Sequence, residues 1–191
     1  MKTQKQIYEK YRWFFTSSGK LVIGGKNSEQ NEEIMKSVKK DDFVLHTAEP
    51  GSPFCVISNP DKKELEEVAI FTASFSQQWK KGQKKAEVHI FQGSQVKKAK
   101  SMKEGTFGIT GKIEKKKVEL KLALDFQKSK LRALPVSAAK KPILYLVPGS
   151  LSKEAAAERI AEIIRYKIFY PVKKEEIFAA IPSDKIGILE K

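Results

Sequence analysis

The sequence has 191 residues, of which 40% are hydrophobic and 31% are charged, a balance typical of a globular protein with a buried core. Its 37 Lys and Arg against 23 Asp and Glu give a formal net charge of +14, which favours a polyanionic partner such as a nucleic acid. No apolar run approaches the roughly 20 residues of a membrane-spanning helix, and the single Cys55 excludes an internal disulfide, so we expect a cytoplasmic protein with no membrane partner.

The first predicted elements are two helical segments on either side of a short strand. Apolar residues near helical spacing predict a helical segment over residues 5–15. Residues 21–23 are Leu, Val and Ile and predict a strand, which a pair of glycines ends. Either Asn27 or Ser28 then caps a helix that extends to about residue 38.

The middle of the chain alternates strands with one long helix. Residues 43–46 and 54–57 predict strands on either side of a Pro-Gly-Ser turn. An aspartate opens the clearest helix, over residues 61–82, because its apolar residues recur at helical spacing until a glycine ends it. Residues 87–91 and 106–111 are further predicted strands, joined by a lysine-rich connection.

The character of the sequence changes after residue 112. Residues 113–126 alternate charged with apolar residues and predict a half-buried strand or hairpin, whereas residues 128–141 are basic and irregular. The remaining predicted elements are a strand, a serine-capped helix, a short helix and a strand, at residues 143–147, 152–167, 175–180 and 186–189. We therefore expect an α+β fold, with a mixed sheet and packed helices in residues 1–112 and a smaller C-terminal α+β unit in residues 113–191.

Residues suited to catalysis or metal binding are few. His46 and His89 have no evident catalytic partner in the sequence, and lone histidines are more often structural. Cys55 lies between Phe54 and Val56 and is interpreted as a small buried hydrophobe. Because no ligand spacing or nucleotide-binding pattern is visible, we predict no cofactor, no metal and no catalytic residue.

Candidates for RNA contact follow the uneven charge distribution. Residues 79–103 have a net charge of +7 and residues 26–67 a net charge of −4, a polarity that favours an oriented polyanion site over a merely soluble surface. The cluster Lys97, Lys98 and Lys100 is the first candidate for phosphate contact, with an ordinary solvated loop as the alternative.

Two further candidates lie nearer the N-terminus. Lys26 follows a glycine turn at a predicted helix N-terminus, where backbone N–H groups favour an anion; the alternative is a tight turn that needs glycine for its geometry. Arg12 and Trp13 combine a cation with a ring that could stack on a base, although such aromatics more often pack into a core.

Three blocks of residues in chain order carry a family resemblance. They are Tyr11-Arg12-Trp13-Phe14, then Gly24-Gly25-Lys26-Asn27-x-x-Gln30-Asn31, then His46-x-x-x-Pro50-Gly51-Ser52. Together they resemble the R domain of the NFACT proteins over about residues 8–112. Many relatives have a histidine where this chain has Pro53 and a charged residue where it has Ala48, so roles tied to those side chains are not implied.

The resemblance implies RNA binding in translation. Large NFACT proteins combine this domain with a tRNA-binding N-terminal domain and a coiled coil, recognise obstructed large ribosomal subunits and promote C-terminal tailing of stalled chains. This chain looks like a stand-alone R domain with an added C-terminal unit, so we do not expect it to perform tailing alone.

We therefore expect a non-enzymatic protein that binds tRNA or rRNA, with the large ribosomal subunit as a partner, in translation or ribosome-associated quality control. One alternative is an RNA-processing or RNA-modifying enzyme that uses His46. Another is an adaptor that docks on the ribosome through a protein partner. The predicted RNA-binding residues are Arg12, Trp13, Lys26, Asn27, Gln30, Asn31, His46, Lys97, Lys98 and Lys100.

Overall fold

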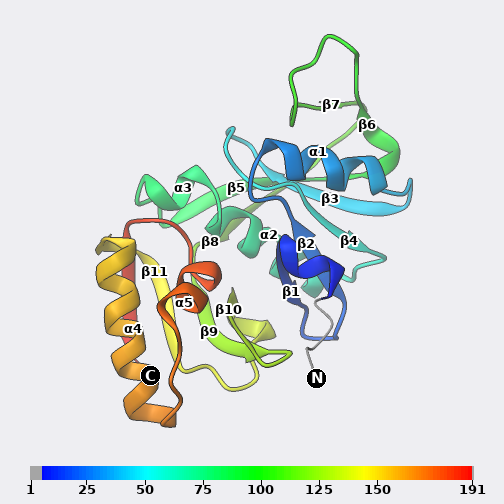
Figure 1. The fold of residues 1–191 in the computed structure, drawn as a ribbon. Helices are drawn as coiled ribbons and strands as arrows, with labels where there is room; N and C mark the ends of the chain where they lie inside the picture. The colour runs from blue at the N-terminus through cyan, green and yellow to red at the C-terminus, as the bar shows by residue number, and fades with distance from the viewer. Residues whose placement is uncertain (1–5, 191) are drawn as a thin grey trace.

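Two β-sheets organise residues 6–190, the part of the chain that the computed structural model describes (Figure 1). The first sheet has six strands in the order β1 (Arg12–Phe15), β2 (Leu21–Gly24), β4 (Cys55–Ser58), β3 (Asp42–Thr47), β5 (Lys85–Gln92) and β8 (Glu114–Glu119). The second has four strands in the order β10 (Lys130–Pro135), β9 (Leu122–Gln127), β11 (Leu144–Leu151) and β12 (Ile186–Glu190). A separate ribbon pairs β6 (Val96–Lys97) with β7 (Gly108–Ile109).

The α+β class predicted from the sequence is confirmed. We expected a mixed sheet; within residues 6–190, neighbouring strands pair antiparallel throughout. The helical elements are η1 (Ile7–Lys10), α1 (Ser28–Ser37), α2 (Lys62–Ser74), α3 (Gln77–Lys80), η2 (Gly93–Gln95), η3 (Val136–Ala138), α4 (Lys153–Ile168) and α5 (Lys174–Ala180).

Helices cover both faces of the six-stranded sheet. α2 packs on one face and also contacts β9 and β10 of the second sheet. α1 packs on the opposite face, where Ile34 and Met35 meet Val44, Val56 and Phe91 in a small buried cluster. Successive residues of a strand point to opposite faces of the sheet. The strand residues that alternate with this cluster therefore face α2 and belong to a second, larger buried cluster. α4 and α5 pack against the four-stranded sheet.

One large buried cluster connects the two sheets. It includes Phe71 of α2, Val118 of β8, Leu122 of β9 and Ile160 of α4. β8 lies just after residue 112, and it pairs with β5 in the six-stranded sheet. The division of the chain into units 1–112 and 113–191 stays a prediction.

The helix caps predicted at Asn27 and at Ser152 are confirmed. The Asn27 side chain accepts a hydrogen bond from the Gln30 N–H, 2.8 Å away, and α1 begins at Ser28. Ser152 caps α4 by accepting from the Ala155 N–H. Such caps satisfy backbone donors that have no partner inside the helix.

Two helix predictions are wrong in part. Residues 7–10 form one short 3-10 turn, but β1 replaces the rest of the helical segment predicted over residues 5–15. Both faces of β1 are covered, so its sequence lacks the alternation typical of a half-exposed strand. The predicted helix over residues 61–82 is interrupted after Ser74, because the Ser76 side chain caps α3 by accepting from the Gln78 N–H.

Further differences lie after residue 112. The segment 113–126 contains β8 and β9, which belong to different sheets and do not form a hairpin. Within the stretch 128–141, predicted to be irregular, β10 pairs with β9 through a turn at Lys128 and Ser129. β11 continues past the predicted end at Pro148, with a register irregularity between Pro148 and Leu151.

Candidate nucleic-acid interface

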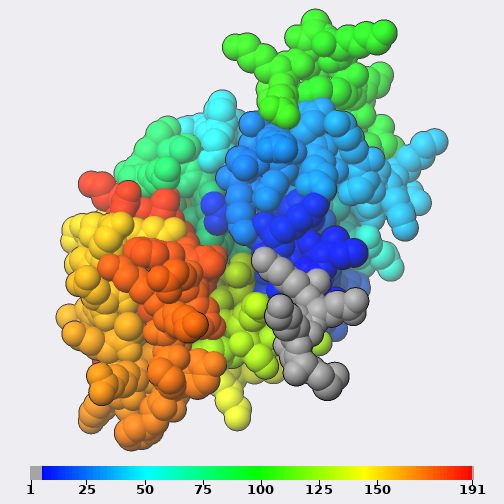
Figure 2. All heavy atoms as spheres, in the orientation of Figure 1, coloured from blue at the N-terminus to red at the C-terminus, as the bar shows by residue number. Residues whose placement is uncertain are grey.

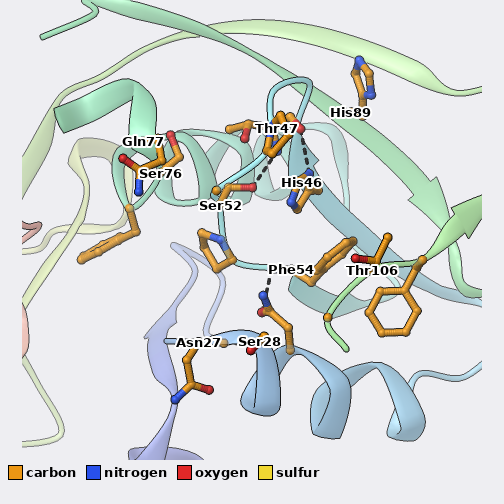
Figure 3. A pocket seen from close by; sticks show the side chains of 18 of the residues that line it. Asn27, Ser28, His46, Thr47, Ser52, Phe54, Ser76, Gln77, His89 and Thr106 are labelled. Carbon is orange, nitrogen blue, oxygen red and sulfur yellow. Dashed lines mark hydrogen bonds between the residues drawn. The ribbon is translucent and has the colours of Figure 1, made fainter. Parts of the chain in front are cut away.

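A cleft with a volume of about 610 Å³ opens between α1 and the segment that connects β3 to β4. Figure 3 shows Asn27 and Ser28 at the beginning of α1 on one side and Ser76 and Gln77 on another. Thr106, from the segment before β7, lies on a third side. Elements distant in the sequence therefore form the walls.

The charged residues described as lining the cleft are all basic. Arg12, Lys26 and Lys80 line it together with His46 and His89. Among residues 6–190, none of those that line the cleft is Asp or Glu, although the chain contains 23 acidic residues. A concave site lined by cations and by no carboxylate favours an anionic ligand.

Arg12 is held on β1 at the edge of the buried core. Its guanidinium carbon lies 4.7 Å from the centroid of the Phe75 ring. Burial lowers the pKa of Arg12, but an arginine keeps its charge in a protein. The pKa of Arg132 is lowered to about 10, mainly by burial and then by the charge of Arg12. The pKa of Lys153 is also lowered, again mainly by burial and then by Arg12. Arg12 thus contributes to a positive field behind the cleft.

The segment between β3 and β4 is tied down at three points. The Thr47 N–H donates to the Ser52 hydroxyl at 2.9 Å, and the Thr47 hydroxyl donates to the Glu49 carbonyl. The Gln77 N–H donates to the Gly51 carbonyl at 2.9 Å, which joins this segment to α3. Gly51 has φ +93°, a conformation that favours glycine. This wall is therefore pre-formed.

One wall of the cleft is aromatic. The His46 ring stacks on Phe54 with centroids 4.3 Å apart and an angle of 29° between the planes. Phe107 meets Phe54 edge to face at 5.2 Å. Asn31 fixes the backbone of this wall, because its side-chain oxygen accepts from the Phe54 N–H at 3.1 Å.

The protonation of His46 follows from its contacts. Its Nδ1 lies 2.7 Å from the Thr47 carbonyl oxygen, which can only accept, so Nδ1 carries the hydrogen. Burial lowers the pKa of His46, against the opposing effect of this hydrogen bond, and His89 across the strand pair lowers it further. The neutral ring leaves Nε2 as a hydrogen-bond acceptor.

Half of the ten predicted residues line the cleft. Gln30 does not, because its side chain accepts from the Lys26 N–H and donates to the Lys10 carbonyl. Those that the structure brings together are Arg12, Lys26, Asn27, Asn31 and His46; those that lie elsewhere are Trp13, Gln30, Lys97, Lys98 and Lys100.

Trp13 is buried, with 1% of its surface exposed. Tyr8 and Phe15 approach its ring edge to face, and the Arg132 guanidinium carbon lies 4.5 Å from its centroid. A ring enclosed in this way has no face for an RNA base. We therefore correct the predicted site by leaving Trp13 out.

The three predicted lysines divide by their contacts. Lys98 donates to Glu32 of α1 at 2.9 Å and to the carbonyls of Lys103 and Thr106. It also lies 4.7 Å from the Phe107 ring centroid. Lys98 thus holds the segment before β7 against α1. Lys97 and Lys100 are exposed where the chain around β6 and β7 projects beyond α1 (Figure 2).

Several lining residues were missed at the sequence level. Lys80 belongs to the basic stretch 79–103, but its position on α3 depends on the break at Ser76, which the sequence pattern does not predict. Phe54 and Phe107 were interpreted as strand residues, and Gln77 as part of one long helix. Their convergence comes from long-range packing, for which no local signal exists.

The rest of the described chain offers little else for chemistry. Burial raises the pKa of the Cys55 thiol to about 12, so it is not a thiolate nucleophile. Residues 6–190 contain no group of three His, Cys, Asp or Glu placed to hold a metal ion. None of the helices that the structure describes combines the length and apolar composition of a membrane span.

Comparisons with known proteins identify the family of this chain and several relatives. A family model described as the NFACT protein RNA binding domain matches residues 10–111. The archaeal Rqc2 homolog aRqcH of Methanocaldococcus jannaschii is 28% identical over 208 aligned positions, covering all of this chain and 30% of the relative. The human ribosome quality control complex subunit NEMF is 33% identical over 78 residues, 38% of this chain and 7% of that protein.

A solved structure shares the fold. The C-terminal part of the fibronectin/fibrinogen-binding protein from Streptococcus suis superposes with a TM-score of 0.53 and 20% identity. The match covers 62% of this chain and 48% of that one. At this identity the likeness concerns the fold alone. The chain spans less than a third of the length of the archaeal and human relatives.

Proposed function

This chain belongs to the family of NFACT RNA-binding domains, and from that premise we propose that it binds tRNA or rRNA through the cleft in ribosome-associated quality control. One observation carries the proposal: the cleft gathers Arg12, Lys26 and Lys80 and is lined by no carboxylate within the described residues. Phosphate neutralisation by such side chains supplies most non-specific nucleic-acid affinity.

The remaining lining residues supply recognition beyond charge. Asn27 and Gln77 carry amide groups, and neutral His46 offers Nε2 as an acceptor. These groups suit the base edges and 2′-hydroxyls that distinguish RNA from DNA. Lys97 and Lys100, exposed on the projecting segment, extend the proposed contact to phosphates outside the cleft.

The proposed role is binding rather than chemistry. A histidine that acts as a general base is commonly oriented by a carboxylate. Here the Nδ1 of His46 donates to a backbone carbonyl, and no carboxylate lines the cleft among residues 6–190. We propose that the protein acts in the cytoplasm, with the large ribosomal subunit as its partner. Residues 1–112 would provide most of the RNA contact, since Ile113 and Ser183 also line the cleft.

The adaptor alternative has one observation in its favour. At the C-terminal end of α4, Tyr166 and Phe169 are 83% and 89% exposed. Exposed aromatic side chains close together often mark a protein contact. If this end of α4 docks on a ribosomal protein, replacing both residues with serine will reduce ribosome association and leave binding to isolated RNA unchanged.

The test of RNA binding is fluorescence anisotropy with labelled tRNA, a structured rRNA fragment and duplex DNA of matched length, over a salt series. We expect the RNAs to be preferred at about 150–200 mM salt, where purely ionic binding is weak. The double variant Lys26→Gln, Lys80→Gln should lose affinity. Its charge-matched control is Lys62→Gln, Lys63→Gln on α2, outside the cleft. Equal binding to all three nucleic acids, abolished by salt, contradicts the proposal.

A further inference from the structure

The cleft combines an aromatic wall with a cationic one, a pairing that a phosphate site alone does not need. The aromatic wall consists of His46, Phe54 and Phe107, joined by the stacked and edge-to-face contacts described above. The cationic wall contains Arg12, Lys26 and Lys80. Stacking on aromatic rings together with phosphate contacts is how proteins hold unpaired nucleotides.

The two walls are adjacent. A Cβ built on Gly25 would lie 2.1 Å from the Asn31 side-chain oxygen, the same atom that accepts from the Phe54 N–H. The turn that carries Lys26 therefore lies directly against the backbone of the aromatic wall. Gly105 similarly approaches Ser28, with its built Cβ 2.9 Å from the Ser28 Cβ, and this places the Phe107 segment beside the start of α1.

The size of the cleft matches a small ligand rather than a helix. Its volume of about 610 Å³ lies inside the range of roughly 300–1,000 Å³ typical of small-molecule pockets. Bases inside a duplex are stacked on their neighbours and present only their edges, whereas an unpaired nucleotide can turn out and enter a pocket.

The aromatic wall is also fixed in advance. Lys98 and the Gly105 N–H both bind the Glu32 carboxylate, each at 2.9 Å, so the segment leading to Phe107 is fastened to α1. Fixing side chains before binding reduces the entropy lost when a ligand is held. Lys98 is thus a positioning residue for the wall.

We propose that the cleft takes one unstacked nucleotide of an RNA bulge, loop or end, with its base against the His46 and Phe107 rings, which the buried Phe54 ring supports from behind, and its phosphate toward Lys26 and Arg12. This rests on the proposed function and names the RNA element that the site selects. Helical RNA then contributes only phosphate contacts outside the cleft.

Three RNAs of one sequence test the proposal: a perfect duplex, the same duplex with a single bulged nucleotide, and the same bulge made abasic. The bulged and abasic RNAs carry the same phosphates and differ only in the base. We expect the full chain to bind the bulged RNA about five- to 150-fold more tightly than either of the others, the range that stacking of one base implies.

Variants locate the effect. Phe107→Leu keeps most of the apolar volume but removes the ring, so it should reduce the affinity for the bulged RNA toward the affinity for the abasic one. Phe169→Leu is the matched control, because it removes an exposed ring at the end of α4, far from α1 (Figure 1). Near-equal affinity for all three RNAs, unaffected by Phe107→Leu, would overturn the nucleotide pocket while RNA binding stands. Binding no better than to duplex DNA at 150–200 mM salt would overturn both.

Discussion

The Asn31 side chain holds Phe54 in place: its oxygen accepts a hydrogen bond from the Phe54 N–H at 3.1 Å and packs where a side chain on Gly25 would lie. The amide thus joins α1, the glycine turn and the aromatic wall of the cleft. Asn31 was predicted to bind RNA, and the structure gives it a positioning contact that can be tested separately.

Gly25→Ala should displace Asn31 and disturb this junction. The added Cβ would meet the Asn31 oxygen at 2.1 Å and break its bond to Phe54. We expect a loss of about 1–3 kcal/mol of unfolding free energy, the usual effect of leaving a buried backbone donor unpaired, together with weaker RNA binding. Urea denaturation and anisotropy measure the two. Gly108→Ala is the control, since its Cβ meets the flexible end of Met102 at 3.1 Å and the Lys97 carbonyl oxygen only at an ordinary contact distance of 3.7 Å; equal losses for both variants would contradict this account.

Glu64 should make stability depend on acid pH. Burial alone would raise its pKa, but hydrogen bonds from Lys20, Ser18, the Asp61 N–H and Thr16 outweigh this and lower it to about 2 from an ordinary 4.5. As the pH falls, Glu64 is therefore protonated in the unfolded chain before it is protonated in the folded protein. Its contribution to stability is complete above about pH 4.5 and is lost as the pH falls toward 2. Thermal unfolding of wild type and Glu64→Gln from pH 6 to pH 2.5 should show a shallower decline in the variant. Parallel curves would show that other groups control acid unfolding.

Protonation of His46 should also reduce stability as the pH falls, although it adds a positive charge whereas protonation of Glu64 removes a negative one. Its lowered pKa means that the unfolded chain takes up a proton first, so stability falls as pH drops below about 6.5. Protonation of the folded ring adds a positive charge to the cleft, so RNA affinity should rise as the pH falls through the lowered pKa of His46, below the pH at which stability begins to fall. His89 and Lys115 face His46 along the same sheet face through successive strand pairs. His46→Gln should make both profiles less steep; a flat wild-type profile rules His46 out.

Lys98→Met should weaken binding to bulged RNA without changing its salt dependence. Lys98 is occupied by Glu32 and two carbonyls, so its loss loosens the Phe107 segment rather than removing a phosphate contact. A phosphate-contacting lysine instead contributes about 0.9 to the slope of log K against log salt on duplex nucleic acid. We expect a reduced slope for Lys26→Met. A slope reduced equally by Lys98→Met would return Lys98 to the set of phosphate contacts, as the sequence predicted.

Features that depend on neighbouring residues could be predicted from the sequence alone. The Asn27 and Ser152 caps use residues three positions apart, so composition and spacing reveal them. The excess of lysine over residues 79–103 and the glycine turn before Lys26 indicated a polyanion site for the same reason. The family blocks, the α+β class and five residues of the cleft follow from information of this kind.

Local patterns also fail in definable places. The hairpin between β9 and β10 turns at Lys128 and Ser129, with φ of 50° and 59°, whereas such turns are usually marked by Asn-Gly or Asp-Gly. β1 carries apolar residues toward both faces and resembles a helix in its spacing. In both cases pairing with a neighbouring strand decides the conformation, and that pairing is not encoded within the segment.

Only the tertiary structure decided which polar residues are free to meet a ligand. Lys98 binds Glu32, 66 positions away, and Arg132 donates to the Trp13 carbonyl across 119 positions. Contacts over such separations depend on the packing of whole sheets and helices. Lys98, in a basic run, therefore connects two segments, and Trp13, beside Arg12 in the sequence, is buried. The same packing brings Phe54 and Phe107 together at the cleft. The sequence by itself therefore indicated the kind of partner that we propose, and the fold determined which residues form the cleft proposed to meet it.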